Sequence, residues 1–63
     1  MDFYRIVAVK DGVQRVLDIP VSEVSIVAQE ARWDGWRVSY VLLPEGAELI
    51  PGVLEESVDM PKN

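Results

Sequence analysis

Residues 3–19, FYRIVAVKDGVQRVLDI, decide the fold of this chain. Two runs rich in β-branched and aromatic residues, Phe3–Lys10 and Val13–Ile19, are separated only by Asp11-Gly12. An Asp-Gly pair between apolar runs favours a two-residue type I′ turn, because both central positions of that turn need a positive φ. The stretch therefore predicts a β-hairpin.

The two-residue turn also predicts the register of the hairpin, in which Arg5 faces Asp18 and Val7 faces Val16. One face of the first strand carries Tyr4, Ile6 and Ala8, and the other carries Phe3, Arg5, Val7 and Val9. Both faces are largely apolar. We therefore expect this strand to lie in the middle of a sheet, covered on at least one side.

A helix is predicted over Ser22–Trp33, with Ser22 as the N-cap and Gly35 as the terminator. Its apolar positions follow the i, i+3, i+4, i+7 spacing of a buried stripe. They are Val24, Val27, Ala28 and Ala31. A third strand is predicted over Trp36–Leu43, with the Trp36 row facing the helix and a turn beginning at Pro44.

Together these elements predict an α+β fold of the order β-β-α-β. A right-handed crossover through the helix gives a three-stranded antiparallel sheet of order 2-1-3, with one helix packed on one face. We expect residues 1–50 to form a single domain and residues 51–63 to be an acidic C-terminal segment, partly ordered or flexible.

The last 20 residues differ in charge from the rest of the chain. They hold five acids and one base, so four of the five units of net negative charge lie there. The same stretch is also apolar, since it includes Leu49, Ile50, Val53 and Leu54. We expect it to cover the second face of the sheet as a short strand or turn near Glu48–Ile50, with the residues from about Glu55 loose.

Composition excludes most chemistry. The chain has 63 residues, 49% of them hydrophobic, a net charge of −5 and neither cysteine nor histidine, so disulfides and the usual zinc sites are excluded. No nucleophile–base set or glycine-rich phosphate loop is present. We therefore predict a small acidic protein that is not an enzyme and holds no cofactor or metal.

Location follows from the apolar pattern. No uncharged apolar run approaches the roughly 18 residues that would span a bilayer, and the first residues, MDFYR, do not form a basic region leading into a hydrophobic one. We therefore predict a cytoplasmic protein with no membrane partner.

Apolar surface in excess of the predicted core points to a partner. Ile26 and Trp33 project from the far side of the helix, and exposed aromatic side chains are typical of interface hot spots. The alternative is that Trp33 folds back over Trp36 or the edge of the hairpin. The candidate partner-binding residues are Ile26, Gln29, Trp33, Arg37, Glu55 and Glu56.

The helix end Ala31-Arg32-Trp33 and the following Gly35-Trp36-Arg37-Val38, closed by Pro44, resemble the small RNA polymerase inhibitor of T7-like phages. The likeness covers roughly residues 3–44. In that family two arginines on the last strand grip the polymerase, whereas the matching positions here hold Tyr40 and Leu42. The resemblance implies a class of compact phage proteins that bind and block a host protein.

Three functions remain open. The first is a non-enzymatic protein-binding module, such as a phage-encoded inhibitor of an unidentified host protein, acting in the host cytoplasm. The second is a structural protein that forms a homodimer through the open sheet face. The third is a single-stranded nucleic-acid binder using Arg5, Arg37 and Phe3. The negative charge disfavours nucleic acid, and pairing of Arg5 with Asp18 is the simpler interpretation of that face.

Overall fold

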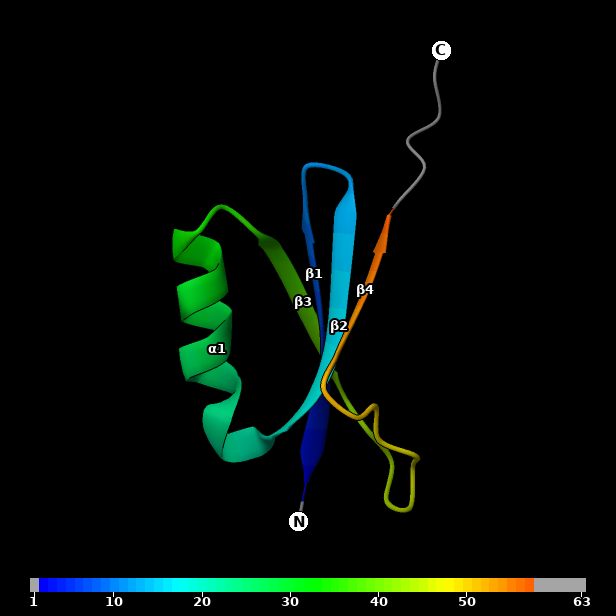
Figure 1. The fold of residues 1–63 in the computed structure, drawn as a ribbon. Coiled ribbons are helices and arrows are strands. Elements are labelled where there is room, and N and C mark those ends of the chain that lie inside the picture. Colours follow the sequence, from blue (N-terminus) through cyan, green and yellow to red (C-terminus); the bar gives the residue numbers. More distant parts are fainter. Residues whose placement is uncertain (1, 58–63) are drawn as a thin grey trace.

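A computed structural model describes residues 2–57 of the chain. It contains one helix and an antiparallel sheet, which confirms the α+β class (Figure 1). The elements are β1 (Phe3–Lys10), β2 (Val13–Pro20), α1 (Val21–Trp33), β3 (Arg37–Leu42) and β4 (Val53–Ser57). The sheet has four strands in the order β3-β1-β2-β4. The predicted order of the first three strands is correct, but the prediction of three strands missed the edge strand β4.

The hairpin of β1 and β2 forms as predicted. Asp11 has a φ of 50° and Gly12 a φ of 78°, which is the pair of positive angles that a type I′ turn needs. Arg5 faces Asp18 and Val7 faces Val16 in the observed register. Because β3 pairs with the other side of β1, the first strand lies inside the sheet, as its two apolar faces predicted.

The fourth strand, β4, pairs antiparallel with the outer edge of β2. The prediction that residues from about Glu55 are loose is therefore wrong for Glu55–Ser57, which belong to this strand; residues 58–63 lie outside the described part of the chain. The sheet thus extends past residue 50, where we placed the end of the domain. Periodicity missed β4 because it is short and holds two consecutive glutamates.

The helix begins one residue earlier than predicted, at Val21, and Ser22 is not its N-cap. Pro20 occupies the cap position with a φ of −60° and provides no side-chain hydrogen bond to the helix. The Val21 N–H instead donates to the carbonyl of Asp2 at 3.0 Å. Tertiary structure therefore gives the first N–H of the helix a partner, because β1 begins beside the start of the helix.

The helix ends as the sequence predicts, in a glycine turn. Gly35 has a φ of 90°, its N–H donates to the carbonyl of Arg32, and the N–H of Trp36 donates to the carbonyl of Ala31. These two hydrogen bonds are those of the Schellman motif. The turn reverses the chain and directs it into β3.

The core is small. Ile6, Ala8, Val24 and Ala28 are buried between α1 and the sheet, whereas Val16, which pairs with Val7, is buried on the opposite face. Val24 and Ala28 form the deepest part of the predicted helix stripe, while Val27 and Ala31 are only partly buried. The buried side of the helix is therefore narrow, and it cannot cover a sheet of four strands.

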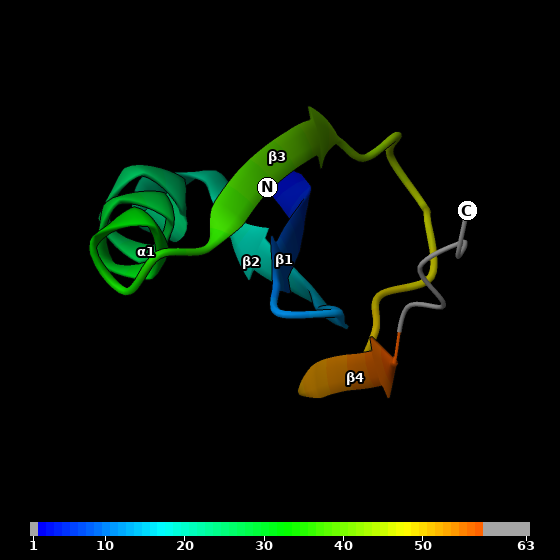
Figure 2. The ribbon, with the colours of Figure 1, turned by 90° about the horizontal axis from the view of Figure 1, so that it is seen from above.

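The connection from β3 to β4, residues 43–52, crosses the face of the sheet opposite α1 (Figure 2). It begins where the Leu43 N–H donates to the Phe3 carbonyl at 2.9 Å. It then passes over Asp18, whose carboxylate accepts a hydrogen bond from the Ile50 N–H at 2.8 Å. As expected, the stretch near Glu48–Ile50 lies on the second face, although it is an irregular loop and not a strand.

Candidate functional site

A hollow with a volume of about 550 Å³ lies between α1 and the edge strand β3. We call it the α1–β3 groove. Its lining combines aromatic and aliphatic side chains with polar ones, and the residues that matter below are Tyr4, Val24, Ala28, Gln29, Trp33 and Tyr40. The groove exists because α1 lies over β1, β3 and β2 with a narrow buried stripe, Val24 and Ala28, that does not fill the space above Tyr4 and Tyr40.

Exposed aromatic and aliphatic groups line this side of the sheet. The Tyr40 and Tyr4 rings make an edge-to-face contact, with centroids 5.7 Å apart, and form part of the groove floor. Even so, Tyr40 remains 50% exposed and its neighbour in the same row, Leu42, 51% exposed. Apolar side chains of this size are usually buried in a partner or a core. The groove thus presents unsatisfied apolar surface.

Trp33 is the most exposed of the large apolar residues, at 75%, and Ile26 follows at 59%. The prediction that both project from α1 is confirmed, and the alternative, that Trp33 folds back over Trp36, is wrong. The Schellman turn at Gly35 separates the two indoles. The guanidinium carbon of Arg15 lies 4.6 Å from the centroid of the Trp36 ring. Trp33 instead lines the groove.

The structure divides the predicted partner-binding residues into two groups. Gln29 and Trp33 line the groove, and Ile26 is exposed on the same helix. Arg37 lies on β3 but belongs to the opposite face, since it is paired with Val9. Glu55 and Glu56 lie on β4, at the other edge of the sheet. The six residues therefore do not form one surface.

Glu55 has a local partner. Its carboxylate accepts a hydrogen bond from the Arg15 guanidinium at 2.5 Å, across the β2–β4 pair, and both side chains are about half exposed. The guanidinium also contacts Trp36. This arrangement indicates that Glu55 attaches β4 to the sheet.

For this reason we expect Glu55→Gln to lower the free energy of unfolding by less than about 1 kcal/mol, the usual contribution of an exposed ion pair, and to leave partner binding unchanged. Urea unfolding followed by circular dichroism measures the first effect. If Glu55→Gln instead lost partner binding at unchanged stability, Glu55 would belong to the partner-binding surface.

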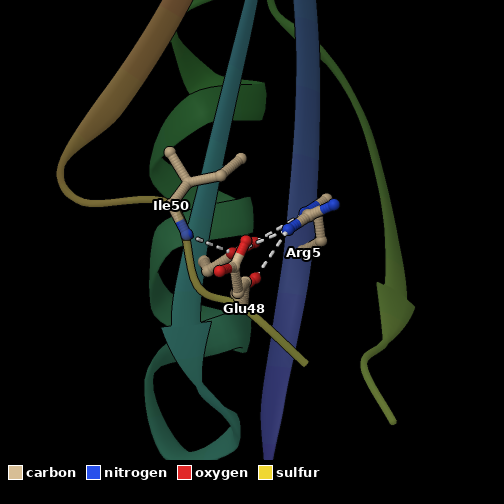
Figure 3. A network of polar contacts seen from close by, with 4 residues as sticks. Arg5, Glu48 and Ile50 are labelled. Atoms are coloured by element: carbon tan, nitrogen blue, oxygen red, sulfur yellow. Dashed lines mark hydrogen bonds and ion pairs between the residues drawn. The ribbon is translucent and has the colours of Figure 1, made fainter. Parts of the chain in front are cut away.

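The second face holds a polar network around Asp18 (Figure 3). The Arg5 guanidinium donates two hydrogen bonds to the Asp18 carboxylate, at 2.8 and 3.0 Å, and a longer one of 3.4 Å to the Glu48 carbonyl. The side chain of Asp18 has no exposed surface. The Arg5 hydrogen bond lowers the pKa of Asp18, and the Ile50 N–H acts in the same direction against the opposing effect of burial.

The same hydrogen bond raises the pKa of Arg5. The predicted Arg5–Asp18 pair is therefore confirmed. Phe3 also has neighbours on this face, since it borders a hollow with Leu43, Pro44 and Leu49 of the crossing connection. Two of the three residues proposed for nucleic-acid stacking are thus engaged within the chain.

Sequence reasoning missed Tyr4, Val21 and Tyr40 as groove residues. Tyr40 belongs to the Trp36 row, which was predicted to face the helix and so to be part of the core, and no face of the first strand was assigned to the helix. The signal that could have found them is the order of the strands, because the predicted order already put β3 at an edge, and one narrow helix stripe buries few residues of an edge strand.

The fold defines a small α+β protein whose four-stranded antiparallel sheet carries a helix on one face and a crossing loop on the other. Comparison with protein-family models, curated proteins and solved structures found no match for this chain. No helix within residues 2–57 has the length and apolar character needed to cross a lipid bilayer. In the same range, no three acidic side chains gather where they could hold a metal ion.

Proposed function

We propose that the protein is a small non-enzymatic protein-binding module that contacts its partner through the α1–β3 groove and the outer side of α1. The observation that carries the proposal is the position of Trp33, 75% exposed, beside Tyr40, 50% exposed, at one hollow. Tryptophan and tyrosine dominate interface hot spots, and they do so next to pockets that exclude water. The groove provides a tryptophan and a tyrosine beside a hollow.

Charge separates the contact surface from the rest of the molecule. The groove is lined by one charged residue, Arg32, and by no acid. Glu55 and Glu56 lie on β4, at the far edge of the sheet. We therefore infer that the partner inserts apolar side chains into the groove, and that the acidic strand β4 lies outside the contact.

The partner class remains the one that the resemblance implies. A chain of 63 residues whose groove carries exposed aromatic side chains suits a phage-encoded protein that blocks a host protein by occupying a surface. Catalysis is not part of the proposal, because the groove residues provide no nucleophile beside a base. We expect the complex to form in the cytoplasm of the host.

We expect Trp33→Ala to weaken capture of the host partner by about 30-fold or more, the effect of losing a hot-spot residue of about 2 kcal/mol. The circular dichroism spectrum should not change, since the indole is exposed. Affinity capture followed by titration of the captured protein measures the loss. Glu23→Ala, another change at an exposed position of α1, serves as the matched control and should bind as the unaltered chain does.

Trp33 can also report binding directly. In a Trp36→Phe background it is the only tryptophan, so its emission should shift to the blue and its quenching by acrylamide should fall when the captured partner is added. An unchanged spectrum at saturating partner would place the contact elsewhere. A Trp33→Ala variant that unfolds would assign this residue to the core.

The two alternatives have less support. Nucleic-acid stacking needs Arg5 and Phe3, which are engaged with Asp18 and with the crossing connection. A homodimer through the open sheet face would have to form over that connection, which occupies part of the face (Figure 2). Self-association is better supported at another place, the free edge of β3.

A further inference from the structure

Within residues 2–57, no strand pairs with the outer edge of β3, so this edge presents backbone groups without a strand partner. The Leu43 N–H donates to Phe3 of β1, and antiparallel pairing alternates the direction of these groups from one residue to the next. Arg37, Ser39 and Val41 therefore point their backbone groups toward β1. Val38, Tyr40 and Leu42 point theirs outward, away from the sheet.

The two edges of the sheet differ in how they are protected. Natural sheets blunt an edge with charges, prolines or short strands. The β4 edge has such protection, because it is five residues long and carries Glu55 and Glu56. The β3 edge, RVSYVL, carries a single charge at its first residue and no proline. An edge without these devices is suited to pairing with another strand.

We propose that this strand belongs to a second copy of the chain. Two β3 strands would pair antiparallel about a two-fold axis at Tyr40, so that Val38 faces Leu42 of the other copy. All three outward-facing residues would then have backbone partners. The product is an eight-stranded sheet with both copies of α1 on the same face.

The distribution of charge favours this pairing. A net charge of −5 opposes self-association in general, but residues 36–44 contain no acid. The order β3-β1-β2-β4 places the glutamates of β4 at the two outer ends of the eight-stranded sheet. The register also sets Arg37 against Leu43 of the other copy, so that like charges do not face each other.

The buried area suits a weak dimer. Six residues of strand extend over about 20 Å, and half of a tyrosine contributes about 100 Å². Together with Val41 and Leu42, each just over half exposed, the pairing buries on the order of 500 Å² per copy. That value lies near the lower limit for specific interfaces, and we expect a monomer–dimer equilibrium in the micromolar range.

The pairing would also complete the groove. In one copy, α1 walls the α1–β3 groove on one side, and the other side is open at the strand edge. In the dimer, the two grooves join over the paired β3 strands, with one α1 on each side. This inference goes beyond the proposed function, since it adds a second copy to the site, and the edge pairing does not require that a host partner exists.

Sedimentation equilibrium with Tyr40→Pro tests the pairing. Proline removes the outward N–H and is tolerated in an edge strand at such a position. We expect the unaltered chain to form a dimer of twice 7.1 kDa at about 100 µM, Tyr40→Pro to be a monomer, and Tyr40→Ala, which keeps its N–H, to retain a weakened dimer. A monomeric unaltered chain, or a dimer that survives Tyr40→Pro, would overturn the proposal.

Cross-linking tests the register even if Tyr40→Pro unfolds. The chain has no cysteine, so a single one can be introduced without competition. Directly opposed residues of an antiparallel hydrogen-bonded pair lie about 5.5 Å apart at Cα, within disulfide range. Tyr40→Cys should oxidise to a covalent dimer at least tenfold faster than Glu56→Cys on β4. Equal rates would exclude the β3 interface, whatever Trp33→Ala does to partner capture.

Discussion

Ile6→Ala is expected to leave much of the protein unfolded at room temperature. Ile6 is 1% exposed and lies on the central strand, where it faces the helix. Truncating a buried isoleucine costs about 3 kcal/mol, because the transfer free energy is lost and a cavity remains. A domain of this size rarely has more than about 3–5 kcal/mol of stability. One side chain therefore supplies most of the margin.

Ile26→Ala provides the matched control, since it removes the same atoms from a side chain that is 59% exposed. We expect its free energy of unfolding to change by less than about 0.5 kcal/mol. Urea titration followed by circular dichroism measures both variants, and with a slope of about 1 kcal/mol per molar the midpoints should differ by 2 M or more. Similar midpoints for the two variants would contradict the position of the core.

Asp18→Asn is expected to have the second largest effect on the free energy of unfolding, because it weakens two interactions of one carboxylate, the ion pair with Arg5 and the hydrogen bond from Ile50. The Asp18 carboxylate has no exposed surface, pairs with Arg5 and accepts the Ile50 N–H from the crossing connection. Hydrogen bonds to charged groups contribute about 1.5–3 kcal/mol, so a loss of about 2 kcal/mol is expected. Glu48→Gln is the control, because Glu48 offers Arg5 its backbone carbonyl and not its side chain.

The same carboxylate predicts a pH dependence. Its folded-state pKa is lowered, mainly by the Arg5 hydrogen bond, whereas in the unfolded chain it lies near the ordinary value of about 3.9. The stabilisation is therefore present above about pH 4 and is lost as the pH falls through the folded-state value. We expect the stability difference between the unaltered chain and Asp18→Asn to shrink between pH 6 and pH 2. A constant difference would show that charge is not its cause.

The predicted parts of the fold are those that local signals specify. The Asp11-Gly12 turn determines the hairpin and its register, because only a few residue types tolerate two successive positive φ angles. Gly35 marks the helix end for a similar reason. Ser22 shows the limit of such signals, since a favoured capping residue is not used when the Asp2 carbonyl already accepts the first N–H of the helix.

The site was predicted in part, for a related reason. Trp33 and Ile26 follow from helical periodicity, which gives the direction of each side chain around the axis. Tyr40 does not, because an alternating strand pattern distinguishes two faces but does not indicate whether the helix covers a given strand. Whether the helix covers a strand depends on how wide its buried stripe is compared with the width of the four-stranded sheet.

The sequence by itself determined the hairpin, its register and the central place of β1. Each depends on residues close together in the chain or on simple periodicity. Only the tertiary structure decided that β4 extends the sheet, that the connection over Asp18 occupies the second face, and that β3 forms the sheet edge beside the α1–β3 groove. These features depend on which distant segments compete for the same strand edge or sheet face, and short-range patterns carry no information about that competition.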